Sequence, residues 1–353
     1  MKSLVYMSAM SLLLSVLLFI PFCLSLDLDE KDRQLNEGDR LKEYHSRAYQ
    51  WPLPEMNPNT PGWRKIYDRR MDQLNAVEDI GERYNGWIQT IGSGLVAPNF
   101  TEFGWGLTRA PQHVVDTLKA ALHAGLPKAR YEGDVEVIEG QNPPLFIPLP
   151  SNTTHWVLNE LKEMHENWSG VPLVGSIAYG LRVYQDGASL LMHVDRPLTH
   201  IISCILHIDH SETSEPWPIV IEDFQGNTNE VVLESGDMLF YESSKCFHGR
   251  PRMLKGGWYS SIFVHYYPVG WDTESFDLES HYAVPPHWGD DAVSLENDED
   301  KLIVVGTSIK EPNCEHNWCS LKNSVKWYGP AIEGQVITPK WSRETRSTHE
   351  DEL

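Results

Sequence analysis

The sequence predicts a mainly β fold, an antiparallel sandwich or a jelly-roll barrel, with two helices packed on one outer face. After Gly170 come five short segments rich in Val, Ile and Tyr and separated by Gly, Pro, Asp and Asn: LVGSIAYGLRVYQ, THIISCILHIDH, WPIVIEDF, NEVVLESGDMLFYES and WYSSIFVHYYP. Strands at this spacing without intervening helices are typical of antiparallel sheets that close on themselves. A hydrophobic content of 41% in 353 residues is enough for a sizeable core, so we expect a globular protein.

Two helices are expected ahead of the strands. The first begins at Pro111 in PQHVVDTLKAALHAG, repeats apolar residues at helical spacing and ends at Gly125. The second lies in HWVLNELKEMHENW. Its apolar stripe consists of Val157, Leu161, Met164 and Trp168. Stripes of this kind are core-facing surfaces, so both helices should pack against the sheet.

The two ends of the chain predict the location of the protein in the cell. Residues 1–25 run from Lys2 through the apolar stretch LLLSVLLFIPF to small residues, the order of a secretory signal cleaved after Ser25. An uncleaved signal anchor is the alternative, because the apolar stretch is nearly long enough to span a membrane. Cleavage would leave no membrane span in the mature chain. Residues 350–353, EDEL, differ at one position from the retrieval signal of the endoplasmic reticulum lumen, so we expect a lumenal protein, with secretion as the other alternative.

The net charge bears on the expected partners, and the glycosylation motifs bear on the expected compartment. The formal net charge of −21 argues against nucleic acid as a partner. Sequons at Asn99, Asn152 and Asn167 are acceptors for glycosylation only in a secretory protein, which agrees with the predicted signal. We therefore expect a glycoprotein, with two of the three sequons used.

The cysteine spacing agrees with an oxidising compartment. The segment CEHNWC brackets a short loop and predicts a disulfide between Cys314 and Cys319. A zinc site that includes His316 is the other interpretation, but no second cysteine pair lies nearby. A structural bridge is the simpler of the two.

One group of residues predicts a metal centre. In LLMHVD, His193 and Asp195 are two residues apart on an expected strand, so their side chains project from the same face. His248 follows a later strand, far enough along for the chain to wrap around a barrel and return. Two imidazoles and one carboxylate on one side of an iron ion leave the opposite positions open, which is the ligand set of non-haem Fe(II) oxygenases.

The residues around this group resemble a known family. The sequence resembles the catalytic domain of prolyl 4-hydroxylases, within the Fe(II)- and 2-oxoglutarate-dependent dioxygenase superfamily. The resemblance lies in four successive motifs: R-x-Y-x-x-G with Arg182 and Tyr184, His-x-Asp, GDMLFY, and a distal HG followed by a basic loop. The match covers residues 105–272 and leaves 26–104 as an N-terminal extension and 273–353 as a C-terminal tail.

The resemblance implies a fold, an activity and site residues. The fold is a double-stranded β-helix, and the activity is lumenal hydroxylation coupled to decarboxylation of 2-oxoglutarate, with dioxygen consumed and ascorbate as reductant. His193, Asp195 and His248 are implied as iron ligands and Tyr184 as a neighbour of the co-substrate; Tyr184 as a plain buried aromatic residue is the alternative.

The sequence departs from the family at the residue that pairs with the far carboxylate of 2-oxoglutarate. Counting ten residues beyond His248 reaches Trp258, and no Lys or Arg follows as far as Trp271. A buried carboxylate needs a donor, so one cation of the loop HGRPRMLKGG is expected to reach inward. The candidates are Arg250, Arg252 and Lys255.

Two functions of different classes follow. The first is a dioxygenase of the secretory pathway that hydroxylates a protein side chain, with proline taken from the resemblance and lysine, aspartate, asparagine or a small molecule left open. The second is a non-catalytic jelly-roll module that binds a peptide or a glycan, which the missing basic residue at Trp258 keeps open.

Overall fold

The computed structural model describes residues 60–92, 97–133, 135–271, 289–330 and 334–339. The expected signal peptide, the first part of the N-terminal extension and the terminal EDEL lie outside these residues, so they stay predictions. Within the described ranges, no helix is both long and apolar enough to cross a membrane.

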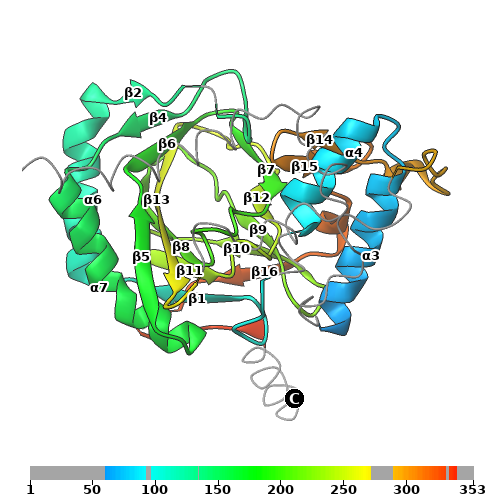
Figure 1. The fold of residues 1–353 in the computed structure, drawn as a ribbon. Helices are drawn as coiled ribbons and strands as arrows, with labels where there is room; N and C mark the ends of the chain where they lie inside the picture. The colour runs from blue at the N-terminus through cyan, green and yellow to red at the C-terminus, as the bar shows by residue number, and fades with distance from the viewer. Residues whose placement is uncertain (1–59, 93–96, 134, 272–288, 331–333, 340–353) are drawn as a thin grey trace, which may run out of the picture. The chain divides into compact units, whose positions relative to one another are not determined.

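Two sheets form the body of the molecule, each with eight strands among the described residues (Figure 1). In sheet order, the first contains β1 (Trp105–Arg109), β11 (Asp237–Tyr241), β8 (Ile202–His210), β13 (Trp258–Pro268), β6 (Leu181–Gln185), β4 (Leu145–Ile147) and β2 (Arg130–Tyr131), with β5 (Leu173–Ala178) also paired to β13. The second contains β14 (Ile303–Val305), β15 (Ser308–Lys310), β7 (Ser189–His193), β12 (His248–Arg250), β9 (Ile219–Glu222), β10 (Thr228–Val232) and β16 (Val325–Tyr328), with β3 (Ile138–Glu139) also paired to β7.

The eight consecutive strands from β6 to β13 pass back and forth between these sheets. Strands β6, β8, β11 and β13 belong to the first sheet, and β7, β9, β10 and β12 belong to the second. Neighbouring strands of this set are antiparallel, as the pairing of His248 with His193 illustrates. The predicted jelly-roll barrel, a double-stranded β-helix with helices on one face, is confirmed.

Two helices, the pair expected from the sequence, cover the outer face of the first sheet. They are α6 (Gln112–Gly125), with a short 3-10 turn η2 (Leu126–Lys128) after it, and α7 (Ser151–Ser169). Val114, Leu118 and Leu122 of α6 and Val157 and Leu161 of α7 are buried in the core against the sheet. The expected apolar stripes therefore face the sheet, because burial of one helix face supplies most of the stability of such helices.

Strand β13 shows how the two faces of the first sheet differ. Ile262 and Val264 lie in the core shared with α6 and α7. Alternation along a strand turns Tyr259 and Ser261 to the other face, toward the second sheet and the barrel interior. This alternation decides which side chains of β13 face the barrel interior.

Segments on both sides of residues 105–272 pack on the second sheet. From the C-terminal side, β15 pairs with β7 and β16 runs parallel to β10, beside the short turns η3 (Asp298–Asp300), η4 (Glu315–Asn317) and η5 (Cys319–Asn323). From the N-terminal side come α3 (Pro61–Asn75), α4 (Ile80–Gly86) and the π-helix η1 (Trp87–Gly92), near β14 and β15 in Figure 1. Thr60 caps α3 by accepting from the Trp63 amide, and Pro61 follows at the first helical position.

Candidate metal centre

The three predicted ligands lie together between neighbouring strands of the second sheet. His193 ends β7, Asp195 follows it by two residues, and His248 begins β12 directly opposite His193 in the register. One ligand atom from each of the three lies within 4.8 Å of the other two. The structure therefore brings together residues that are far apart in the sequence, as the motif predicted.

The imidazoles are oriented so that both Nε2 atoms face Asp195. Nδ1 of His193 lies 2.8 Å from the Leu191 carbonyl oxygen, and Nδ1 of His248 lies 2.9 Å from the Cys246 carbonyl oxygen. A carbonyl can only accept, so each Nδ1 carries the proton and donates it, and each Nε2 keeps its lone pair. Both Nε2 atoms are 3.7 Å from Asp195 Oδ1.

Burial keeps both imidazoles neutral at neutral pH. It lowers the pKa of His193 to about 4, with the neighbouring His248 acting in the same direction, and lowers the pKa of His248 to about 4. Neutral imidazole is the form that binds metal ions. Two lone-pair nitrogens and one carboxylate on one side fit a divalent transition metal with its remaining positions open.

Further contacts position Asp195. Its backbone amide donates to the Ser243 carbonyl at 2.7 Å, and Tyr241 Oη donates to Oδ2 at 3.3 Å. Burial, together with the charge of Asp195, raises the pKa of Tyr241 well above its ordinary value, so this phenol stays a donor. His265 Nδ1 lies 3.8 Å from the same oxygen and 2.7 Å from Ser203 Oγ. Partners of this kind hold a ligating carboxylate in one orientation.

Tyr184 and Arg250 lie in the barrel interior near the metal ligands. Both are buried, with only 1% and 2% of their surface exposed. Arg250 projects from the same face of β12 as His248, two residues earlier. Tyr184 lies opposite Tyr259 in the pairing of β6 with β13. Its hydroxyl makes no hydrogen bond of regular geometry among the described residues, although it interacts electrostatically with the guanidinium of Arg182.

The guanidinium of Arg250 is held by rings and neutral oxygens. It lies 4.6 Å from the ring centroid of Trp217 and 4.5 Å from that of Tyr259. Its Nη1 donates to the Trp217 carbonyl and its Nη2 donates to Tyr259 Oη at 3.2 Å. No carboxylate in the described part of the chain forms an ion pair with it. The Trp217 ring that Arg250 contacts also contacts the ring of Tyr184. A buried guanidinium without a carboxylate partner is suited to bind an anion.

The other two cations of the basic loop point elsewhere. Arg252 Nε lies 2.9 Å from Glu230 Oε2, and Lys255 is an exposed residue whose Nζ is 3.8 Å from Glu215. Because both side chains are turned toward other carboxylates, the structure leaves Arg250 as the member of the trio inside the barrel.

Strand alternation explains the absence of a cation at Trp258. Trp258 packs against the helix-facing core, whereas Tyr259, one residue later, faces the interior and contacts Arg250. Ungapped counting from His248 therefore reaches the wrong face of β13. Sequence reasoning missed Tyr259 and Trp217, and the period-2 pattern of WYSSIFVHYYP is the signal that could have found Tyr259.

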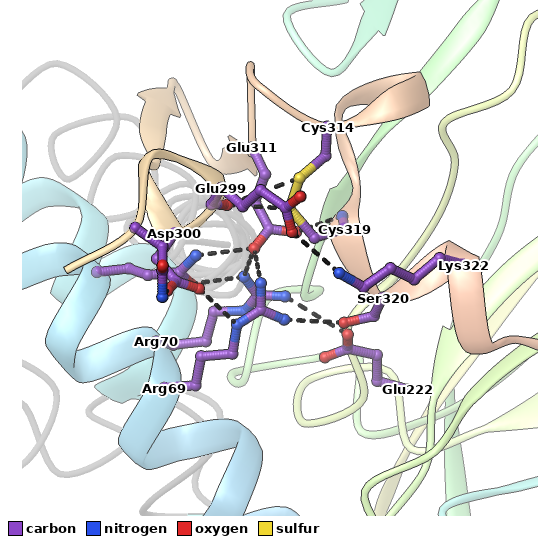
Figure 2. Close-up of a disulfide and its surroundings, with 12 residues drawn as sticks. Arg69, Arg70, Glu222, Glu299, Asp300, Glu311, Cys314, Cys319, Ser320 and Lys322 are labelled. Atoms are coloured by element: carbon purple, nitrogen blue, oxygen red, sulfur yellow. Dashed lines mark hydrogen bonds and ion pairs between the residues drawn. A yellow bond between two sulfur atoms is a disulfide. The ribbon is translucent and has the colours of Figure 1, made fainter. Parts of the chain in front are cut away.

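The predicted disulfide between Cys314 and Cys319 is present and lies beside a group of buried charges (Figure 2). Glu299 is the only acidic residue grouped with these two sulfurs in the described ranges, and both sulfurs are already used by the bridge. His316 lies 3.2 Å from Glu315. The interpretation of this segment as a structural bridge is thus confirmed.

No family model and no curated protein matches the sequence. Among solved structures, a Pseudomonas putida prolyl-4-hydroxylase has a TM-score of 0.37 at 14% identity and covers 47% of this chain and 94% of its own. HygX from Streptomyces hygroscopicus, with nickel and 2-oxoglutarate bound, has a TM-score of 0.37 at 12% identity over 48% of this chain and 85% of its own. A 2OG-Fe(II) oxygenase family oxidoreductase from Burkholderia pseudomallei has a TM-score of 0.36 at 16% identity over 48% and 87%.

These likenesses are too weak to carry an argument about chemistry. The chain has a double-stranded β-helix fold. The chemistry of its site rests on its own residues.

Proposed function

We propose that the chain is an Fe(II)- and 2-oxoglutarate-dependent dioxygenase. The observation that carries the proposal is the convergence of two neutral imidazole nitrogens and one carboxylate oxygen at the end of β7 and the start of β12. His193, Asp195 and His248 would hold the iron and leave its other positions open. When bound, ferrous iron supplies the activation of dioxygen that side chains cannot perform.

The barrel interior supports 2-oxoglutarate as the co-substrate. A dicarboxylate whose oxo-acid end lies at the metal needs a cation for its far carboxylate, and Arg250 is on the ligand strand, buried and without an acidic partner in the described ranges. Tyr184 offers a hydroxyl for the same group. These two residues would bind and orient the acid, and the rings of Trp217 and Tyr259 would exclude water from the contact.

The substrate is proposed as a protein side chain, with peptidyl proline supported by the sequence resemblance. Access would come from the side of Asp195, whose side chain is 15% exposed, rather than past His248, whose side chain is 3% exposed. Tyr179 and His200 lie on this side in contact with His265. Ascorbate as a reductant belongs to the same proposal.

We further propose residence in the lumen of the endoplasmic reticulum, supported by the signal-like start, the EDEL end and the disulfide. Asn152 and Asn167 are exposed on α7, on the side of the first sheet away from the metal ligands, whereas the Oδ1 atom of Asn99 is enclosed. Glycans at Asn152 and Asn167 would leave the metal site accessible.

The decisive experiment measures metal content and substrate-independent turnover of the purified lumenal chain. We expect one Fe(II) per chain and slow conversion of 2-oxoglutarate to succinate that requires iron. Metal binding without any conversion, with or without proline-containing peptides, would favour a non-catalytic jelly-roll binding module. Absence of metal binding would contradict the proposal outright.

A further inference from the structure

Ser308, in the segment predicted as a C-terminal tail, lies beside the metal centre. Strand β15 pairs with β7 so that Ser308 is directly opposite His193. On its other side, His193 is opposite His248 of β12. Residues opposite each other on adjacent strands project from the same face with neighbouring Cβ atoms. The side chain of Ser308 therefore projects to the face on which the metal ligands lie.

The hydroxyl of Ser308 has no hydrogen-bond partner in the part of the chain that the structure describes. The residue is completely buried, and its Oγ forms no hydrogen bond within the described residues. A buried hydroxyl that stays unpaired is costly, and such groups in native proteins call for an explanation. Its position beside His193 supplies one, because a ligand bound at the metal would bring oxygen atoms to this face.

The segment that carries Ser308 is firmly held three residues further on (Figure 2). Glu311 is fully buried and accepts from Arg70 Nη1 at 2.9 Å and from Gln73 Nε2 at 2.7 Å, both on α3. Its other oxygen accepts from the Cys319 amide at 2.8 Å, next to the disulfide. The backbone of β15 is thus fixed by α3 on one side and by the bridged loop on the other.

We propose that Ser308 contacts the 2-oxo acid bound at the metal centre, donating a hydrogen bond to one of its carboxylate oxygens. This inference rests on the proposed function. It makes the C-terminal segment part of the binding site, so the site extends beyond the residues that resemble the dioxygenase family. If Ser308 were only a small residue that fits between strands, removing its unpaired hydroxyl would leave ligand binding unchanged.

Calorimetry on the full lumenal chain loaded with Mn(II), which binds without turnover, tests this. The probes are 2-oxoglutarate and its inert analogue N-oxalylglycine. We expect Ser308→Ala to raise the Kd for both roughly tenfold, the effect of losing one hydrogen bond to a charged group. The Mn(II) affinity and the melting temperature of the metal-free chain should not fall.

Thr108→Val is the matched control. Thr108 is also fully buried with an unpaired hydroxyl, but it lies opposite Met238, whose side chain belongs to the core beneath the helices. This substitution should leave both Kd values unchanged.

Three results would overturn the inference. Equal Kd values for Ser308→Ala and the unaltered chain would show that the hydroxyl contacts neither probe. A lower melting temperature of the metal-free Ser308→Ala chain would show that the hydroxyl has a structural partner instead. Failure of the unaltered chain to bind Mn(II) or 2-oxoglutarate would overturn the proposed function together with this inference. The first two results would overturn the inference alone.

Discussion

Arg250 follows His248 by two residues on β12, so one short strand carries a proposed metal ligand and a buried guanidinium on the same face. The chain between them is extended, and the two side chains cannot move apart independently. β12 pairs with β7 at both positions, His248 opposite His193 and Arg250 opposite Leu190, with a register irregularity between the two. In the proposed enzyme, this strand would therefore offer an imidazole to the cation and, two residues later, a hydrogen-bond donor to the anion.

Replacing Arg250 with Met should weaken the binding of 2-oxoglutarate strongly. A buried carboxylate that loses its cation is destabilised by about 3–5 kcal/mol, so we expect the KM for 2-oxoglutarate to rise roughly a hundredfold or more. Initial rates at varied 2-oxoglutarate measure this. Arg252→Ala and Lys255→Ala are the controls, and both should be near neutral, since their partners are the carboxylates of Glu230 and Glu215. A neutral Arg250→Met in an active enzyme would place the anchor elsewhere.

Removing any one of the three proposed ligands should abolish turnover and weaken metal binding by roughly a hundredfold or more. Two protein ligands are too few to hold a labile divalent ion. The substitutions are His193→Ala, Asp195→Ala and His248→Ala. Titration with Mn(II), read by calorimetry, checks the affinity directly. His113→Ala is the control, since His113 is exposed and paired with Glu160 far from the centre. Full activity in Asp195→Ala would refute the ligand assignment.

The contribution of the buried histidines to the stability of the metal-free chain should fall as the pH is lowered from about 6.5 toward 4, whereas buried carboxyls with raised pKa values, such as that of Glu242, contribute with the opposite sign. Burial lowers the pKa of His165 from 6.5 to about 4, so in this window the unfolded state binds a proton that the folded state does not. The free energy of unfolding then rises with pH by up to about 1.4 kcal/mol per unit for each such histidine.

Denaturant unfolding of His165→Phe tests the assignment. His165 is packed against Phe240 and Tyr266, so a phenyl ring suits its surroundings. The variant should lose the share of the pH dependence that one histidine contributes, while His193 and His248 keep theirs. An unchanged slope would show that His165 titrates normally.

Glu311→Ala should destabilise the chain by about 3–5 kcal/mol, because it leaves the buried guanidinium of Arg70 without its nearest carboxylate. Denaturant unfolding measures the change. Glu299→Ala is the matched control in the same region (Figure 2), where Glu299 and Lys322 form an exposed pair at 2.9 Å. Such pairs contribute about 0–1 kcal/mol. Similar losses in the two variants would contradict the central role of Glu311.

Local patterns in the sequence predict the barrel and the convergence of His193, Asp195 and His248. Strand alternation alone places His193 and Asp195 on a shared face, and the distance along the chain to His248 is compatible with one turn of a barrel. The helix stripes likewise require only the 3.6-residue period.

The remaining site residues depend on information that no single segment contains. The position of Tyr259 depends on which parity of β13 faces inward, and a one-residue error in counting selects Trp258 on the other face. The role of Ser308 depends on a pairing between strands far apart in the sequence, with no motif to mark it. Trp217 contacts Arg250 from an irregular stretch ahead of β9, where neither period applies.

The pairing of β15 with β7 also has a consequence for the order of events during biosynthesis. Residue 308 comes late in a chain of 353 residues, so the strand that carries His193 emerges from the ribosome long before its outer neighbour has been made. β3 covers this edge of β7 only at Ser189 and Leu190, so until then the Met192–His193 end is open to other partners, including other nascent chains. This end of the edge is closed only when β15 has been translated. The proposed site beside His193 would thus be complete only after residue 308 has been translated.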